Sequence, residues 1–153
     1  MRLLLFSDSH GSVHHLLTMM SRAQREGPVD AILFAGDGIG DLAFLQAGCP
    51  VHAVRGNCDL GSSMEKELLL NFGSQQVYLT HGHLHRVKHG LSLLASDALE
   101  RGAQVAVFGH SHQQGAAIKN GVLCVNPGAL SKGEYAMLLK DNNGQPESRF
   151  YQL

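Results

Sequence analysis

Short apolar runs recur along the chain, separated by segments with a helical or polar pattern. Each run is four or five residues long, which is the length of a buried strand. The runs cover residues 3–6, 31–35, 51–54, 77–80 and 105–108. Helical patterns lie between them at about residues 12–26, 40–47 and 89–101, and Gly27-Pro28 and Gly102 provide stop signals for the first and the last. Alternating strands and helices predict an α/β fold with parallel, right-handed crossovers.

The C-terminal third has a different pattern. Asn120-Gly121 and Asn143-Gly144 each separate short apolar stretches. Asn-Gly between such stretches is typical of a tight turn in an antiparallel hairpin. We therefore expect mixed strand directions there, with no further crossover helices.

Composition limits the class of protein. A chain of 153 residues with 44% hydrophobic content and net charge -1 predicts one domain, residues 1–153, with a substantial core. No repeat or linker interrupts it, and no apolar run approaches the roughly 20 residues of a membrane span. The basic excess of a dedicated nucleic-acid binder is also missing. The expected partner is a small molecule, with neither a membrane nor a strong nucleic-acid signal.

Three cysteines, Cys49, Cys58 and Cys124, leave one unpaired in any disulfide scheme. The opening "MRLLLF" is too short for the apolar region of a signal peptide. These features predict a reduced protein in the cytoplasm. The oligomeric state is open, with a homodimer as one candidate.

Polar side chains follow each of the five apolar runs, in the stretches "SDSH", "GDG", "RGNCD", "HGH" and "GHSH". Ten histidines in a chain with only 12 Lys and Arg direct attention to ligand chemistry. One such stretch alone is explained by a turn or a helix cap, but recurrence after five strands is not. Because the carboxyl ends of parallel strands converge at one edge of a sheet, the candidate ligands would meet there: Asp8, His10, Asp37, Asn57, His81, His110 and His112.

The ordered series Asp8-x-His10, Gly36-Asp37, Gly56-Asn57, His81 and Gly109-His110-x-His112 resembles the calcineurin-like metallophosphoesterase superfamily across nearly the whole chain. The short length, "GNCD", "THGH" and "NPG" resemble its small bacterial and archaeal phosphodiesterase branch. The resemblance implies two facing mixed β-sheets flanked by helices, an αββα sandwich, with two divalent metal ions.

The resemblance also implies the ligand sets. One ion would be held by Asp8, His10, Asp37 and His112, and the other by Asp37, Asn57, His81 and His110. Asp37 would bridge the ions, and Asp37, Asn57 and His81 would be the catalytic residues. Two ions roughly 4 Å apart can clamp a phosphoryl group while metal-bound hydroxide attacks phosphorus in line. Mixed imidazole and oxygen ligands favour Mn²⁺ as our first choice, with Zn²⁺, Fe²⁺ and Ni²⁺ as alternatives.

Arg55 and His83 are the candidate substrate contacts, because each lies two residues from a proposed ligand. Arg86 and Lys88 are expected to be solvated surface charges. Two departures bear on catalysis. Cys58 replaces a histidine that is frequent in the superfamily, and we expect it to be a packed or supporting residue. Ala129-Leu130-Ser131-Lys132 departs from the usual sequence after "NPG", which leaves the phosphate contacts of that loop open.

The leading hypothesis is a metal-dependent phosphodiesterase. A phosphomonoesterase or nucleotide pyrophosphatase on the same site is the first alternative. The second is a weakly active interaction scaffold, because the eukaryotic retromer scaffold subunit resembles this fold. A substrate panel separates the enzymes, and metal content separates them from the scaffold.

Overall fold

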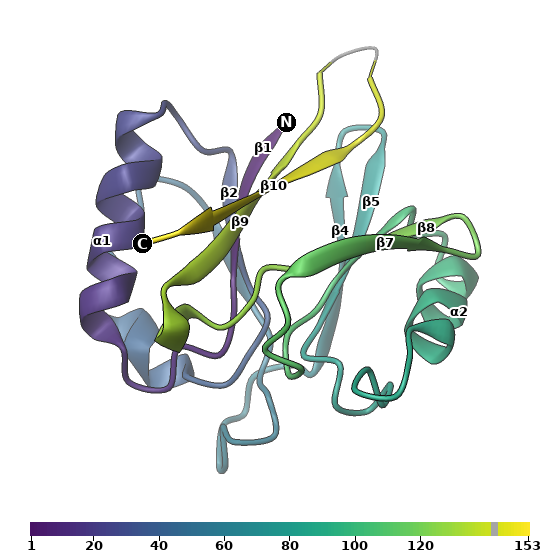
Figure 1. The fold of residues 1–153 in the computed structure, drawn as a ribbon, viewed down its shortest axis with the longest axis horizontal. Helices are drawn as coiled ribbons and strands as arrows, with labels where there is room; N and C mark the ends of the chain where they lie inside the picture. The colour runs from purple at the N-terminus through teal and green to yellow at the C-terminus, as the bar shows by residue number, and fades with distance from the viewer. Residues whose placement is uncertain (142–143) are drawn as a thin grey trace.

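The computed structural model describes residues 1–141 and 144–153. Within them, ten strands form two five-stranded sheets that face each other, and one α-helix packs on the outer side of each sheet (Figure 1). Both sheets are mixed. The fold is an αββα sandwich, which confirms the predicted class.

The first sheet has the strand order β10-β9-β1-β2-β3. Strands β1, β2 and β3 are parallel, and the C-terminal hairpin adds β9 antiparallel to β1 and then β10. The bounds are β1 Arg2–Phe6, α1 Val13–Arg25, β2 Ala31–Phe34, β3 Val51–Ala53, β9 Glu134–Leu139 and β10 Glu147–Gln152. Short 3-10 helices cover Ile39–Phe44, between β2 and β3, and Leu130–Lys132, before β9.

The second sheet has the order β4-β5-β6-β8-β7. Its three central strands are parallel, whereas β4 and β7 are antiparallel edge strands. The bounds are β4 Glu67–Phe72, β5 Gln75–Thr80, α2 Ser92–Glu100, β6 Val105–Val107, β7 Gly115–Lys119 and β8 Val122–Asn126.

Alternation along the strands builds the layers. Leu3 and Leu5 lie in the core between the sheets, while Leu4 and Phe6 face α1, because successive side chains of a strand point to opposite faces. In α1, the buried residues recur at helical spacing: Leu16, Met19, Met20 and Ala23. Tyr78 and Ala106 form a third cluster against α2. Each helix thus seals the outer face of one sheet.

All five apolar runs form strands, and α1 and α2 lie within two of the predicted helical segments. The prediction of a helix over 40–47 was wrong in type, because this segment forms the 3-10 helix Ile39–Phe44. Strand β4 was missed; it is a half-exposed edge strand whose Leu68, Leu70 and Phe72 pack against the core between the sheets. Asn120 and Gly121 both have positive φ in the β7–β8 hairpin, as expected. The predicted turn at Asn143-Gly144 falls partly on residues 142–143, outside the described residues.

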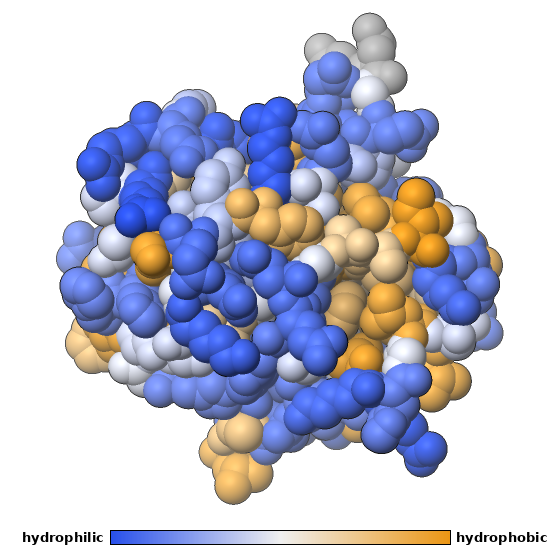
Figure 2. All heavy atoms as spheres, in the orientation of Figure 1, coloured by the Kyte–Doolittle hydropathy of each residue, from blue (hydrophilic) through white to orange (hydrophobic). Residues whose placement is uncertain are grey.

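Hydrophilic side chains cover most of the visible surface over α1 and β10, whereas hydrophobic side chains gather beside β7 (Figure 2). Ile118 of β7 is among the exposed apolar residues. Neither α1 nor α2 has the length and apolar character needed to cross a membrane, and the described residues contain no other candidate span.

Candidate metal centre

The loops that follow β1, β2, β3, β5 and β6 come together at one end of the sandwich, along the lower edge of the view in Figure 1. Backbone hydrogen bonds tie neighbouring loops together. The Asp8 N–H donates to Gly36 O at 2.9 Å, and the Gly109 N–H donates to His81 O at 3.1 Å. A third bond, from His110 N–H to Asp8 Oδ2 at 3.0 Å, joins the two sheets. The expected convergence therefore occurs, but it involves strand ends from two sheets.

Many of the candidate ligands share an unusual backbone conformation. Positive φ angles, from 44° at His10 to 65° at His110, are found at Asp8, His10, Asp37, His110 and His112. This left-handed region is costly for most residues with a Cβ, although Asp and His tolerate it better than bulky or β-branched residues. A left-handed residue turns the chain sharply as it leaves a strand. Here the turn directs successive side chains toward the same point.

Asp8 is fully buried, and its two oxygens have different surroundings. Oδ2 accepts hydrogen bonds from the Ser7 hydroxyl at 2.6 Å and the His110 N–H at 3.0 Å. Oδ1 lies 3.0 Å from His112 Nε2 and 3.8 Å from His10 Nε2. One oxygen thus holds the fold together, and the other faces imidazole nitrogens.

Asp37 repeats this division. Its Oδ1 accepts the Cys58 N–H at 2.8 Å, and its Oδ2 lies 3.3 Å from His81 Nε2. The same His81 nitrogen is 3.2 Å from Asn57 Oδ1. Both carboxylates therefore offer one free oxygen to the same end of the sandwich.

The tautomer of His81 provides a test of whether a cation fits. His81 Nδ1 lies 2.6 Å from the carbonyl oxygen of Ala35, which can only accept, so Nδ1 carries the proton in the neutral ring. Nε2 then points a lone pair at Asp37 Oδ2 and Asn57 Oδ1. In the neutral ring three electron-rich atoms would face one another, and either a proton on Nε2 or a cation relieves this arrangement. A divalent cation would satisfy all three, and imidazole, carboxylate and amide donors suit a first-row transition ion.

Charge coupling is strong even without such an ion. Burial raises the pKa of Asp37, but hydrogen bonds from His81 and the Cys58 N–H outweigh burial and hold this pKa far below its ordinary value. Burial lowers the pKa of His81, while the Asp37 hydrogen bond and the Asp8 charge raise it by more. Burial, followed by the charges of His81 and Lys88, lowers the pKa of His110 to about 4. Near neutral pH, His110 therefore presents an unprotonated nitrogen that can act as a ligand.

The structure brings all seven sequence-predicted ligands to this centre. Ligand atoms of Asp8, His10 and His112 lie within 4.8 Å of one another, as do those of Asp8, Asp37 and His81. The His110 ring lies 5.1 Å from the His81 ring, centroid to centroid, and Asn57 reaches the centre through its contact with His81. Asp8 belongs to both groups, so these residues form one continuous cluster.

Asp59 organises the loop around Asn57. Its carboxylate accepts four backbone hydrogen bonds, from the N–H groups of Asp37, Gly38, Ile39 and Gly56, at 2.8 to 3.0 Å. These donors lower the pKa of Asp59 despite the opposing effect of burial. Asp59 thereby joins the loop after β2 to the loop after β3.

Cys58 is exposed, so of the two predicted roles, packed or supporting, the packed side chain is excluded. Its backbone N–H supports Asp37, and its sulfur lies 3.4 Å from Asn57 Nδ2. Hydrogen bonding to Asp37 and, next, burial raise the pKa of the thiol. Cys58 is therefore protonated at neutral pH. By contrast, Cys124 is buried and Cys49 is half-buried.

His83 and Arg55, the predicted substrate contacts, occupy different places. The His83 ring lies 5.4 Å from His81 and 6.1 Å from His110, so it borders the centre. Arg55 lines a neighbouring pocket together with Leu84. Lys132, in the loop after "NPG", lies with Nζ 3.5 Å from His112 O, which places one cation beside the centre.

Several supporting residues were missed by sequence reasoning. Asp41 accepts hydrogen bonds from the Ser9 hydroxyl at 2.6 Å and the Gly11 N–H at 2.9 Å, and so fixes the loop that carries His10. Asn126 donates to Gly109 O at 3.1 Å, and so supports the loop that carries His110. Both are buried polar side chains. Asp41 has no motif in the sequence, whereas Asn126 is the first residue of the Asn-Pro-Gly stretch quoted above, whose sequence does not indicate this hydrogen bond.

A second polar cluster lies under the His83 loop. Asp97 of α2 accepts the Tyr78 hydroxyl at 2.7 Å and lies 2.9 Å from His85 Nε2. Arg101 binds both Asp97, at 3.1 Å, and Glu67, at 3.0 Å. Because Arg101 bridges both carboxylates, this cluster ties α2 to β4 and β5.

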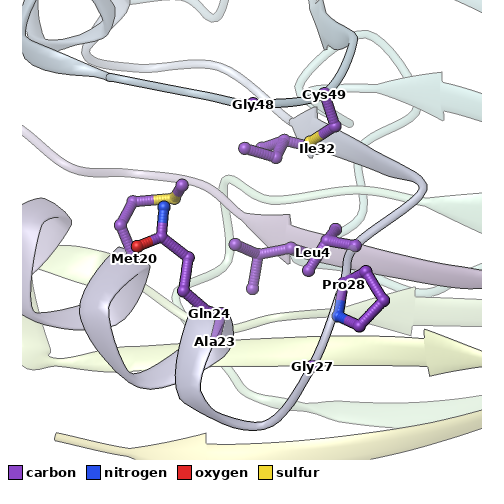
Figure 3. Close-up of a pocket in the computed structure, with 10 residues that line it drawn as sticks. Leu4, Met20, Ala23, Gln24, Gly27, Pro28, Ile32, Gly48 and Cys49 are labelled. Carbon is purple, nitrogen blue, oxygen red and sulfur yellow. The ribbon is translucent and has the colours of Figure 1, made fainter.

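An apolar pocket of about 300 Å³ lies beside the C-terminal end of α1. Leu4, Met20, Pro28, Ile32 and Cys49 are among the side chains that line it (Figure 3). Gly27-Pro28 and Gly48-Cys49 precede β2 and β3, so the pocket lies toward the strand ends opposite the candidate ligands. It contains none of them.

Comparison with known proteins agrees with this arrangement. Residues 1–140 match the family model of the calcineurin-like phosphoesterase superfamily domain. The chain is 38% identical over 158 residues to the probable metallophosphoesterase YsnB of Bacillus subtilis, covering 99% of this chain and 90% of YsnB. It is also 34% identical over 108 residues to the phosphodiesterase YfcE of Escherichia coli, covering 60% of this chain and 53% of YfcE.

Solved structures show the same fold. A predicted phosphoesterase from Streptococcus pneumoniae superposes with a TM-score of 0.79 at 26% identity, covering 99% of this chain and 88% of that one. A Vps29 variant from Entamoeba histolytica superposes with a TM-score of 0.75 at 16% identity, covering 100% and 99% of the two chains. The Vps29 likeness concerns the fold alone.

The sandwich and its cluster of histidine and carboxylate ligands define a metal-dependent phosphoester hydrolase. The chain belongs to the calcineurin-like phosphoesterase superfamily.

Proposed function

We propose that this protein is a phosphodiesterase in which two divalent ions, Mn²⁺ by preference, activate water for in-line attack on phosphorus. Asp8, His10, Asp37 and His112 would hold one ion; Asp37, Asn57, His81 and His110 would hold the other. The observation that carries the proposal is the convergence of the free Asp8 and Asp37 oxygens with His81 Nε2, flanked by the remaining imidazoles. When bound, the ions would supply positive charge to the phosphoryl oxygens and lower the pKa of water.

The chain's own residues have separate tasks in this proposal. Asp37 lies between the two groups of ligands and is held in place by the Cys58 N–H. The hydrogen bond to Ala35 O orients the His81 ring, so that Nε2 faces Asn57 and Asp37. His83 borders the centre and can contact a phosphoryl oxygen or an ester oxygen.

Cys58 stands where the superfamily often has histidine. The thiol is exposed and has a raised pKa, but it is a weak hydrogen-bond donor. We propose that water supplies the leaving-group proton and that Cys58 contributes mainly its backbone N–H. Diesters with a good leaving group would need such an acid least.

The test is hydrolysis of bis(4-nitrophenyl) phosphate after metal removal and addition of Mn²⁺. We expect turnover by the wild type, none with excess chelator, and at least a hundredfold loss in Asp37→Asn, which removes the charge but preserves the shape. Glu100→Gln is the matched control, because this exposed side chain makes no hydrogen bond or ion pair within the described residues. Equal turnover in the wild type and Asp37→Asn would refute the assignment.

Two alternatives predict other outcomes. A phosphomonoesterase or nucleotide pyrophosphatase would show higher kcat/KM for 4-nitrophenyl phosphate or a nucleoside diphosphate than for the diester. An interaction scaffold, to which the Vps29-like fold gives some support, would take up no Mn²⁺ and hydrolyse none of the three. The arrangement of His81, Asp37 and Asn57 favours metal uptake, and turnover of one of the three substrates then distinguishes an enzyme from a metal-binding scaffold.

A further inference from the structure

A second pocket, of about 430 Å³, lies beside the candidate metal centre. Its walls continue the segments that carry the proposed ligands. Arg55 lies two residues before Asn57, and Leu84 directly follows His83. On the far wall, Glu67 begins β4 and pairs with Thr80, the residue before His81. The pocket therefore borders the segments that carry the proposed ligands.

Unpaired positive charge lines this pocket. Arg55 and Lys66 make no ion pair and no side-chain hydrogen bond within the described residues. The Glu67 carboxylate is engaged by Arg101 at 3.0 Å and by His85 at 3.8 Å. Glu65, which is exposed, is the remaining acid of the lining. Two free cations therefore face one free acid.

The pocket lining reaches the surroundings of the metal centre. Leu84 belongs to the lining and directly follows His83, whose ring lies 5.4 Å from the ring of His81. An anionic group in the pocket and a phosphoryl group at the centre could belong to one substrate.

Apolar side chains complete the lining. Met64 is 39% exposed and Leu84 is 51% exposed, although both belong to the pocket wall. Carbon atoms of a ligand would cover these side chains while its charged end reached Arg55 and Lys66. The pocket thus suits an alkyl or aryl group that ends in an anion.

We propose that this pocket binds one arm of the substrate and that the natural substrate is a phosphodiester carrying a second anionic group on that arm. This inference rests on the proposed phosphodiesterase function and adds the substrate class. Arg55 then recognises the distal anion with its planar fork of donors, and does not contact the phosphate undergoing reaction. Lys66 adds a point charge at the pocket rim.

Two diesters with the same leaving group test the proposal: n-butyl 4-nitrophenyl phosphate and 3-sulfopropyl 4-nitrophenyl phosphate. Their reacting phosphates are alike, and only the distal charge differs. The wild type should show a kcat/KM about fivefold higher for the sulfonate, mainly through KM, because two partly exposed charge contacts each contribute a small factor. Added salt should reduce this preference.

Variants then show which residues cause the preference for the sulfonate diester. Arg55→Gln with Lys66→Gln should bring the ratio of the two kcat/KM values to about one, and Lys66→Glu should reverse it. Lys119→Gln is the matched control, because Lys119 is an exposed cation of β7, on the opposite edge of the sheet from β4. It should retain the full preference. The ratio within each variant cancels differences in folding and metal loading.

Each outcome is decisive. Hydrolysis of the butyl diester with no sulfonate preference, or with a preference that survives in the double variant, would overturn this inference and leave the proposed function standing. Hydrolysis of neither diester by the metal-loaded wild type would overturn both. Loss of the preference in Lys119→Gln would show that general surface charge, and not this pocket, is responsible.

Discussion

Replacing Asp59 with alanine tests how the metal-centre loops are held in place. The Asp59 carboxylate is the common acceptor for the N–H groups of Asp37, Gly38, Ile39 and Gly56. No other side chain within the described residues accepts hydrogen bonds from four backbone donors. Alanine would leave these donors unpaired unless water reached them.

The magnitude follows from the burial of the donors. Asp37 and Gly56 are buried, so we expect their N–H groups to stay unsatisfied at about 1–3 kcal/mol each. Gly38 and Ile39 are half-buried, and water can replace the lost acceptor there. The free energy of unfolding should therefore fall by about 3 kcal/mol.

Urea unfolding in excess chelator measures this loss without any contribution from bound metal. Glu100→Ala, on the exposed surface of α2, should change the free energy of unfolding by less than about 0.5 kcal/mol.

The pH dependence of the stability loss is a second check. Because the pKa of Asp59 is lowered in the folded state, its stabilisation is present above the unfolded pKa of about 3.9 and is lost as pH falls toward the folded value. The gap between wild type and Asp59→Ala should thus narrow below about pH 4. A gap under about 1 kcal/mol at pH 7 would refute the role assigned to Asp59.

Two further predictions concern the same loop. A Cβ on Gly56 would collide with the Asp37 carboxylate, so Gly56→Ala should weaken Mn²⁺ binding, measured by calorimetry, at least about tenfold. The control is Gly115→Ala, whose Cβ meets no atom within 4 Å and which should bind Mn²⁺ normally. Equal Mn²⁺ affinities in the two variants would contradict the predicted collision. Cys58→Ser should keep its bound metal and most of its diesterase activity, because the group that supports Asp37 is the backbone N–H. Asn57→Ala should lose bound metal, as measured by metal analysis, and diesterase activity, as measured by turnover. An inactive Cys58→Ser that retains its metal would show that the thiol is a catalytic group.

The hydrophobic pattern of the sequence was sufficient to predict the buried strands in the interior of the fold. Strands β1, β2, β5 and β6 are fully or almost fully buried, so their sequences are continuous apolar runs. Strand β4 was missed because it lies at an edge, where one face remains partly in water. Periodicity also could not predict how the strands divide between the two sheets, since a buried strand has the same hydrophobic pattern in either sheet. Only the resemblance to a known family indicated it.

The candidate ligands could be found because they follow the strands directly, but the groups that orient them could not. Asp41 and Asn126 act on loops that are distant in sequence, through hydrogen bonds to Gly11 and Gly109. Lys66 lies in a segment without any motif, and only the folded chain places it in one pocket lining with Arg55. Sequence spacing identifies donors of the right type, whereas partner and direction depend on tertiary contacts.

Backbone conformation connects the fold to the chemistry. At five of the seven proposed ligands the chain adopts a left-handed conformation, each at a cost of order 1–3 kcal/mol. Random turns would not concentrate this strain where buried carboxylates face imidazoles. The strain persists because hydrogen bonds fix the surrounding loops, including those to Asp59 and Asp41. Weakening either anchor should therefore allow the ligand loops to relax toward unstrained conformations, and should reduce metal affinity together with the stability of the fold.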